Sequence, residues 1–492
     1  MRSTLGPVSE AGTPTGGGDA FQALDDSRIT RFQWKIMVVS GMGFFTDAYD
    51  LFVIGIVVAL LTPQWDLSTS QVSWLNSATL AASAVGALVF GRVADILGRK
   101  KIYGYEVLIL AIGAIASSLA PNYTFLLVSR IILGIGIGGD YPVSATIMSE
   151  YSGKDSRGRM VGLVFAMQGL GLVVGPLIAS ILLASGLSDN LVWRTLLFLG
   201  AIPGLAVFYL RRQIHETPRF ATAAGEGEEA QKAIAAAAGT AAATTADDAP
   251  PAAAPSPAIR NRQRAMEGFA VIARNRRMLL WLVGTAGCWM LLDFAYYGNT
   301  ISSPEILKLI NPHGTLLSNT LLQLAIFAVF ALPGYAVAIW LLDRAGRKTI
   351  QSVGFAMMAL CFLLIGLVPG VTSMVVPFTL LYGVSYFFTE FGPNTTTFVY
   401  PAEIFPVDVR TTGHGISAAA GKMGAFAGAF LFPVLLASHL GLRGAEVISG
   451  VVCLAGLVLT LTLLPEPRGQ SLEELEAEVY EAVEPASLRE AA

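Results

Sequence analysis

Twelve apolar runs, each long enough to cross a lipid bilayer, dominate this 492-residue chain. A bilayer core about 30 Å thick requires about 20 apolar residues per helix. Within a bilayer each backbone polar group must be satisfied by the segment itself, so such runs form helices. The runs fall at 36–60, 72–93, 102–120, 123–147, 159–185, 194–212, 277–300, 317–342, 350–368, 374–400, 412–437 and 445–464. We therefore expect an all-α polytopic membrane protein with six helices on either side of a central gap.

The composition supports this class and argues against others. Hydrophobic residues make up 54% of the chain and charged residues only 14%, whereas a soluble domain carries about 25% charged residues. Nothing indicates nucleic acid as a partner. The cysteines Cys288, Cys361 and Cys453 lie in apolar segments without metal-ligand spacing. We therefore expect no metal site, no cofactor and no disulfide framework. The polar N-terminus lacks the apolar core of a cleaved signal peptide, so the first run is expected to remain as a membrane helix.

Basic residues gather in the loops on one side of the expected helices. The opposite loops hold only Lys308, Arg443 and, at a helix edge, Arg194. By the positive-inside rule this asymmetry places both termini and the central loop in the cytoplasm, for a protein of the plasma membrane. The residues on the basic side are Arg92, Arg99, Lys100, Lys101, Lys154, Arg157, Arg159, Arg344, Arg347, Lys348 and Arg410.

These features divide the chain into an N-terminal tail (1–30), a six-helix bundle (31–212), a linker (213–276), a second bundle (277–467) and a C-terminal tail (468–492). Residues 221–258 are rich in Ala and poor in large apolar side chains, so we expect disorder there. Residues 259–277 carry six arginines around Met266, Phe269 and Ile272. That pattern fits either ordinary flanking charge or an amphipathic helix on the inner leaflet. Residues 471–480 predict a short, solvent-facing helix.

Two carboxylates interrupt the first apolar run. Asp47 and Asp50 are three residues apart, which places them on one helical face. An ionised Asp near the bilayer centre costs several kcal/mol, so such residues usually face a protein interior and serve a function. The pair therefore indicates movement of a proton or an ion. Glu106 and Glu390 also lie within apolar segments, where a structural pairing near a helix end is the favoured interpretation.

The two halves of the chain repeat a charged motif. Asp95-Ile-Leu-Gly-Arg-Lys100 recurs as Asp343-Arg-Ala-Gly-Arg-Lys348, and Glu150 and Arg157 recur as Glu403 and Arg410. Two related bundles meeting at a central cavity are the alternating-access plan. The motifs resemble those of the major facilitator superfamily over essentially the whole membrane-spanning chain, although Ile96 replaces the usual Arg in the first copy. We expect these charges to form a cytoplasmic latch between helices.

Four further motifs resemble the phosphate:proton symporter branch of that superfamily. They are Phe44-Phe-Thr-Asp-Ala-Tyr-Asp50, Gly138-Gly-Asp-Tyr-Pro-Val-Ser-Ala-Thr-Ile-Met-Ser-Glu150, Phe391-Gly-Pro-Asn-Thr-Thr-Thr397 and His414-Gly-Ile-Ser-Ala-Ala-Ala-Gly-Lys422. The resemblance implies that phosphate is bound by Tyr141, Gln168, Trp289, Asp293, Tyr297, Asn394 and Lys422. It implies that proton coupling involves Asp47, Asp50, Arg130 and Asp140.

The chemistry of these residues agrees with the resemblance. Trp289, Asp293 and Tyr297 are four residues apart and form one stripe on a helix. Lys422 lies about 15 Å into the eleventh helix, near mid-membrane, where a lysine needs an anion. Phosphate near neutral pH still carries a proton, so an ionised Asp293 can accept a hydrogen bond from P–OH while the lysine binds bare oxygens. The alternative is a structural ion pair without a ligand, with the aromatic residues as ordinary packing.

The sequence therefore predicts a proton-coupled symporter that brings inorganic phosphate into the cytoplasm, not an enzyme. The four histidines lie at loops or helix ends, so carboxylates are expected to carry the proton, with Arg130 as a movable cation. A sugar or organic-anion porter is one alternative, because His215-Glu-Thr-Pro-Arg219 resembles a sugar-porter motif. A phosphate receptor without net transport is the other. Phosphate, protons and membrane lipid are the expected partners, and the linker holds no recognisable docking motif for a protein.

Overall fold

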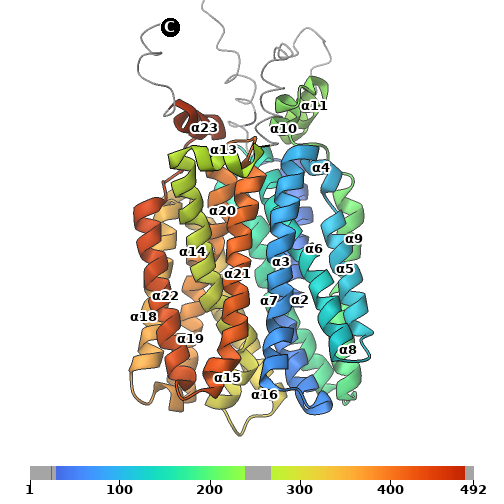
Figure 1. Ribbon diagram of the computed structural model, residues 1–492, viewed down its shortest axis with the longest axis vertical. Coiled ribbons are helices and arrows are strands. Elements are labelled where there is room, and N and C mark those ends of the chain that lie inside the picture. Colours follow the sequence, from blue (N-terminus) through green and yellow to red (C-terminus); the bar gives the residue numbers. More distant parts are fainter. Residues whose placement is uncertain (1–23, 25–28, 239–266, 482–492) are drawn as a thin grey trace, which may run out of the picture.

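The chain folds into long helices that lie side by side with their axes roughly aligned (Figure 1). The computed structural model describes residues 24, 29–238 and 267–481, and these contain no β-strand. Polar N-caps define several helix starts. Thr30 accepts a hydrogen bond from the Gln33 backbone N–H at 3.2 Å, and the Gln33 side chain accepts one from Thr30 N–H at 3.1 Å. Ser68 and Gln71 form the same reciprocal cap one helix later.

The N-terminal half, which we define as residues 31–211, contains six membrane-length segments. Two of them are built from consecutive short helices. The elements are α2 (Arg31–Trp65), α3 (Thr69–Leu97), α4 (Arg99–Ile102), α5 (Tyr105–Ser118), α6 (Tyr123–Tyr151), α7 (Arg157–Ala184), α8 (Asp189–Leu199) and α9 (Ala201–Arg211).

The C-terminal half, residues 276–463, follows the same plan. Its elements are α14 (Arg276–Ile301), α15 (Ser303–Ile310), α16 (Leu316–Ile326), η2 (Phe327–Ala331), α17 (Leu332–Ala345), α18 (Arg347–Leu367), α19 (Val375–Thr389), η4 (Glu390–Asn394), α20 (Thr395–Ile404), α21 (Arg410–Ala437) and α22 (Gly441–Leu463). The predicted all-helical membrane fold is confirmed.

One predicted span, 374–400, is broken so that it contains no membrane-length helix. Eleven helices in the described part of the chain are long and apolar enough to cross a membrane. The predicted run at 374–400 is instead divided into α19, η4 and α20. Gly392 has non-helical angles (φ −102°, ψ −113°) and Pro393 follows it. Because proline lacks an N–H and clashes with the preceding turn, it interrupts the helical ladder. The break lies inside a site motif.

The two halves meet along helices with small residues at their crossings. Within the halves α2 packs against α7, α3 against α6, and α14 against α21; between them α3 packs against α21 and α7 against α17. A Cβ on Gly91 would lie 2.7 Å from the Thr411 carbonyl oxygen, and one on Gly415 would lie 2.6 Å from that of Ala87. Glycine at both positions is what lets α3 and α21 approach so closely.

Buried ion pairs join the halves at one end, which we call the basic end because it carries Arg99 and Arg347. Arg99 lies 3.2 Å from both Asp95 and Glu150. Arg410, from the other half, also contacts Glu150 at 3.2 Å. The Thr412 backbone N–H donates to Asp95 at 2.6 Å. The charges predicted to form a latch therefore do connect the halves, and the basic end is closed.

The second copy of the charged motif repeats this arrangement. Arg347 contacts Asp343 at 3.0 Å and Glu403 at 2.7 Å. The Arg159 backbone N–H, from the N-terminal half, donates to Asp343 at 2.9 Å. Glu466 accepts from the Arg347 backbone N–H, just as Glu216 accepts from that of Arg99 in the first copy. The sequence repeat is thus a structural repeat.

The linker is more ordered at its start than the sequence suggested. Residues 218–223 form α10 (Pro218–Ala223) and residues 227–238 form α11 (Gly227–Ala238), so the prediction of disorder from residue 221 is wrong for these helices. Alanine has the highest helix propensity, and Ala233 and Ala237 are fully buried. The Ala237 carbonyl accepts a hydrogen bond from Thr30 at 3.0 Å. The rest of the predicted disordered segment, 239–258, lies outside the described residues.

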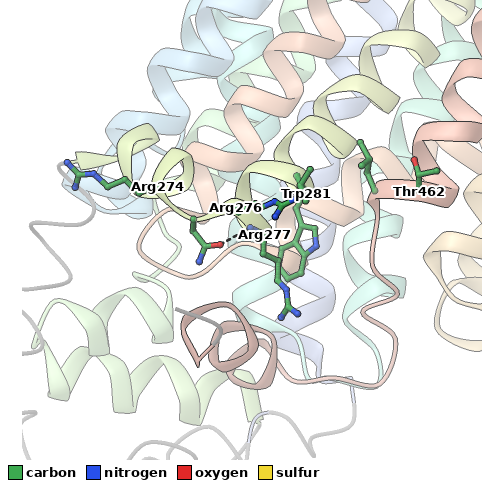
Figure 2. A pocket seen from close by; sticks show the side chains of 8 residues that line it. Arg274, Arg276, Arg277, Trp281 and Thr462 are labelled. Atoms are coloured by element: carbon green, nitrogen blue, oxygen red, sulfur yellow. Dashed lines mark hydrogen bonds between the residues drawn. The ribbon is translucent and has the colours of Figure 1, made fainter. Parts of the chain in front are cut away.

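The arginine-rich segment leads into the C-terminal half. Its described part contains a short helix, α13 (Phe269–Arg274), in which Ile272 is buried and Phe269 is 54% exposed. A pocket of about 430 Å³ lies beside it. Figure 2 shows Arg274, Arg276, Arg277 and Trp281 among the side chains that line this pocket. The sequence left open whether this segment is ordinary flanking charge or an amphipathic helix on the inner leaflet. Its other arginines, Arg260, Arg262 and Arg264, lie outside the described residues.

The C-terminal helix α23 (Leu472–Glu481) packs onto the basic end, near α13 and α20 (Figure 1). Leu472, Leu475 and Val479 are at most 2% exposed, so the predicted solvent-facing helix is instead docked. Glu473 pairs with Arg219 of the linker helix α10 at 2.8 Å. The Asn275 side chain, at the start of α14, donates to the Val479 carbonyl at 3.1 Å. The helix thereby contacts both the linker and the C-terminal half.

Candidate functional site

The predicted cation of the site is buried between the two halves. Lys422, on α21, donates a hydrogen bond to the Tyr297 hydroxyl at 2.8 Å and lies 3.5 Å from Asp293. Its Nζ stands 4.3 Å from the centre of the Tyr141 ring and 4.5 Å from that of Tyr297. All four side chains are at most 2% exposed. Such a lysine, buried against one carboxylate and two rings, has spare donor capacity for an anion.

Aromatic rings close the site towards the basic end. Phe165 of α7 and Phe398 of α20 stack with centroids 4.4 Å apart, and Phe44 of α2 meets Phe398 edge-on at 5.0 Å. We call these three the inner aromatic layer. Tyr141 packs on Phe44 at 5.0 Å. Because each of these phenylalanines lies closer to the basic end of its helix than Gln168, Asn394 or Asp47, the layer separates the site from that end.

Trp289 packs on the same layer from the C-terminal half. Its ring is 6.0 Å from Tyr141 and 6.3 Å from Phe398. His414 meets it edge-on at 5.5 Å, is fully buried, and bonds the Phe398 carbonyl at 3.1 Å. The sequence placed His414 at a helix end and gave it no role. His414 therefore packs against Trp289 and holds its ring in place.

A second set of rings covers the side away from the basic end. Phe52 of α2 stacks on Tyr297 of α14, with centroids 5.4 Å apart and planes 24° apart. Tyr296 meets Phe52 at 5.7 Å. We call Phe52, Tyr296 and Tyr297 the outer aromatic layer. Lys422 and Asp293 are therefore enclosed between two layers, each with rings from both halves of the chain.

Gln168 and Asn394 converge on a residue that sequence reasoning missed. The Gln168 side chain donates to the Tyr335 hydroxyl of α17, and Asn394 donates to the same hydroxyl at 2.8 Å. Asn394 also donates to Glu390, one turn earlier. Tyr335 is 2% exposed and interacts electrostatically with Tyr141 and Tyr297. The sequence shows only that Tyr335 lies in an apolar run, and many tyrosines without a role in a site do the same.

The predicted proton-coupling residues form two groups rather than one. Asp140 accepts from Arg211 at 2.7 and 2.8 Å and from Ser144 at 2.5 Å. Arg211 also contacts Glu106 at 2.8 Å. Glu106 thus has the structural partner that the sequence favoured, and the partner is Arg211. Sequence reasoning missed this arginine, because it ends an apolar run and looks like flanking charge.

The other group surrounds Asp50. Arg130 donates to the Asp50 backbone carbonyl at 2.8 Å and does not pair with Asp140. Gly200, at the junction of α8 and α9, lies against the carboxylate: a Cβ there would be 2.2 Å from Asp50 Oδ1. The carboxylate oxygens of both Asp50 and Asp47 form no hydrogen bond within the described residues. Asp47 is within electrostatic reach of Asp140, Arg211 and Lys422, so it lies between the two predicted sets.

Comparison with known proteins places this arrangement in a family. Residues 34–479 match the family described as "Sugar (and other) transporter". Inorganic phosphate transporter 1-6 of Oryza sativa subsp. japonica is 36% identical, with 96% of this chain and 98% of that one aligned. Low affinity inorganic phosphate transporter 1 of Petunia hybrida is 34% identical over 93% of this chain and 95% of its own.

Solved structures agree on the fold. The proton:xylose symporter XylE, bound to 6-bromo-6-deoxy-D-glucose, matches with a TM-score of 0.73 and 20% identity over 91% of this chain and 99% of its own. The inward open conformation of the same transporter from E. coli matches with a TM-score of 0.64 and 21% identity, over 91% and 100%. The chain therefore belongs to the sugar (and other) transporter family of the major facilitator superfamily and, within it, to the family of the inorganic phosphate transporters.

Proposed function

We propose that this membrane transporter carries inorganic phosphate into the cytoplasm together with protons, by alternating access. The observation that carries the proposal is the buried contact of Lys422 with Asp293 and Tyr297 between two aromatic layers. A neutral sugar gives no reason to bury a lysine in a membrane interior. The names of the relatives support phosphate, since they are described as inorganic phosphate transporters.

In this proposal, Lys422 and Asp293 bind different oxygens of the same phosphate ion. Lys422 binds bare phosphate oxygens, while an ionised Asp293 accepts a hydrogen bond from P–OH. Tyr141, Tyr297 and Trp289 line the same space and can donate further hydrogen bonds. Gln168 and Asn394 reach the ion when they release the Tyr335 hydroxyl. Sulfate carries no proton near neutral pH and would meet the Asp293 carboxylate as a like charge, so the site discriminates against it.

Asp47 connects this site to the proposed proton-coupling residues. It lies within electrostatic reach of Lys422 on one side and of Asp140 and Arg211 on the other. Its oxygens form no hydrogen bond within the described residues. A carboxylate in that setting changes its proton occupancy when the charges around it move. Binding of an anion at Lys422 is such a change, and Asp50 with Arg130 provides a second carboxylate in the same half.

We assign the basic end to the cytoplasm of the plasma membrane, as the positive-inside rule requires. The ion pairs of Arg99, Glu150 and Arg410 close that end. At the opposite end a pocket of about 600 Å³ lies between the halves, lined by Thr69 and Val72 from one and by Lys308 and Pro433 from the other. A closed basic end with a pocket at the opposite end corresponds to a carrier that has closed its cytoplasmic side.

Labelled phosphate uptake into proteoliposomes tests the proposal. With a pH gradient, acid outside, the purified chain should accumulate phosphate above equilibrium, and a protonophore should abolish the accumulation. Labelled xylose and labelled sulfate run in parallel as competing cargo. Uptake of the sugar alone would establish the porter alternative. Saturable phosphate binding without uptake would establish the receptor alternative.

A further inference from the structure

Two buried glutamates in the C-terminal half are used by none of the roles assigned so far. Glu390 lies in η4 and Glu446 lies in the second turn of α22, and both are fully buried. Neither forms an ion pair within the described residues. Both oxygens of Glu446, and Oε1 of Glu390, form no hydrogen bond there. The sequence favoured structural pairing for Glu390, and the geometry does not provide it.

Among residues 29–238 and 267–481, no cation lies beside Glu446 that could neutralise it. The groups that face it are the Asn299 side chain of α14, the Tyr382 hydroxyl of α19 and Cys453 on its own helix. Arg443, one turn earlier on α22, instead donates to the Gly366 and Leu367 carbonyls of α18. An ionised carboxylate without a cation costs several kcal/mol in such a site, so the neutral form, with its proton, is the one that fits.

A row of polar side chains begins within electrostatic reach of Glu446 and runs into the interior of the same half. Tyr382 donates to the Asn299 carbonyl at 3.0 Å and lies 3.2 Å from the Ser303 hydroxyl. Its own hydroxyl is 3.3 Å from that of Tyr386, which donates to Thr300 at 3.0 Å. Hydroxyl groups both donate and accept, so a row of them can pass a proton along while each regains one.

The row of tyrosine hydroxyls, Tyr382 and Tyr386, leads to the proposed phosphate site. Tyr382, Tyr386 and Glu390 follow one another at intervals of four residues, which places them on one face at steps of about 6 Å, and Asn394 follows beyond the break at Gly392. The Tyr296 hydroxyl is within electrostatic reach of both Tyr386 and Glu390. Glu390 accepts a hydrogen bond from Asn394, which is bonded in turn to Tyr335 and, through it, to Gln168. Glu390 therefore touches a proposed phosphate ligand directly.

We propose that Glu446, Tyr382, Tyr386 and Glu390 form a second proton path, in the C-terminal half, that runs from the end opposite the basic end to the phosphate site. This inference rests on the proposed function. A proton enters on the Glu446 carboxylate, passes along the tyrosine hydroxyls and protonates Glu390. It leaves Glu390 for the cytoplasm when the basic end opens. The path works beside Asp47, Asp50 and Asp140, and adds one proton to each transport cycle.

The test measures how many protons accompany each phosphate. In proteoliposomes, the phosphate gradient that just balances an imposed pH gradient gives this ratio. Glu446→Gln keeps the shape of the side chain but cannot exchange a proton, and it should lower the ratio by one while phosphate exchange stays within about twofold of the unaltered protein. Tyr382→Phe, which keeps the ring and removes the hydroxyl, should lower the ratio equally.

The control variant is Glu305→Gln, on α15 at the same end but outside the row, and its ratio should stay unchanged. An unaltered ratio in both Glu446→Gln and Tyr382→Phe, with normal exchange, overturns the second path. So does an equal loss of exchange and accumulation in either variant, because that result assigns these residues to packing. Absence of phosphate uptake by the unaltered protein would defeat the proposed function itself, which is a distinct result.

Discussion

Arg211 holds Asp140 through both of its terminal nitrogens, at 2.7 and 2.8 Å, although the two residues lie 71 positions apart on α9 and α6. The same guanidinium contacts Glu106 at 2.8 Å and covers the Tyr103 ring at 4.4 Å. One buried cation thus pairs with two carboxylates near the basic end. The candidate proton residue Asp140 cannot change its charge without affecting Arg211 and Glu106 as well.

Removing this cation should be costly. Arg211→Gln leaves two buried carboxylates without a cationic partner, and breaking a buried ion pair from one side typically costs about 3–5 kcal/mol. We expect a clearly lower unfolding temperature in detergent and loss of proton-driven accumulation. Arg212→Gln is the matched control, because Arg212 is exposed and contacts no carboxylate within the described residues; it lies over the Tyr105 and Phe208 rings and donates to the Tyr105 hydroxyl at 3.4 Å. Equal stability of the two variants would show that Arg211 is not required for charge balance.

Asp293→Asn tests how the site recognises a protonated oxyanion. Loss of one charge-assisted hydrogen bond is worth roughly 1.5–3 kcal/mol, about ten- to a hundredfold in affinity. Phosphate should therefore bind more weakly, and the margin over sulfate should narrow because the repelling charge is gone. Calorimetric titration of both anions into purified protein measures the two affinities. Unchanged phosphate affinity would remove Asp293 from the site.

Neutralising the N-terminal carboxylates should separate accumulation from exchange. Asp140→Asn, or Asp47→Asn together with Asp50→Asn, should damage pH-driven accumulation more than phosphate exchange, because exchange need not return an empty, deprotonated carrier. Paired liposome assays with and without a pH gradient make the comparison. If accumulation survives in these variants, the proton assignment is wrong. If both activities fall by the same factor in folded protein, these residues bind substrate or shape the helices.

The Glu473–Arg219 pair should stabilise the docking of α23 at neutral pH and lose this effect in acid. Burial alone would raise the pKa of Glu473, but pairing with Arg219 outweighs it and holds that pKa below its ordinary value. A lowered folded-state pKa stabilises the docked helix above the unfolded pKa of about 4.3, and this contribution is lost as the pH falls through the folded value. The protection factors of residues 472–481, which divide the intrinsic amide exchange rate at each pH by the observed rate and so remove the intrinsic effect of pH, should therefore be constant from neutral pH down to about 5 and fall below that.

Arg219→Gln should accelerate this exchange at neutral pH, because Glu473 then loses its partner. Glu474→Gln, on the exposed side of the same helix, should leave the exchange unchanged, since the amide oxygen can still accept from the Ser471 backbone N–H as the carboxylate does. Rapid exchange of α23 in the unaltered protein at neutral pH would mean that the helix is not held at the basic end.

The sequence predicted what depends on local pattern and missed what depends on contacts between helices. The length of the apolar runs predicted the membrane spans, and the position of Lys422 near the middle of one run indicated a site residue. Tyr335, His414 and Phe398 could not be recognised, because an aromatic residue in an apolar run gives the same signal whether it faces lipid or substrate. Arg211 was misjudged because flanking arginines are common at helix ends. The alanine-rich start of the linker was misjudged because small side chains can still be buried against a neighbouring helix.

The two aromatic layers have a consequence for leakage across the membrane. Ring faces and edges offer few hydrogen bonds to a hydrated anion, so an ion between the layers cannot keep its water shell while it slips past either one. Each layer also takes its rings from both halves, through Phe165 with Phe398 and through Phe52 with Tyr297. Opening a layer therefore requires the halves themselves to part, which prevents the protein from becoming a pore that dissipates the gradients it uses.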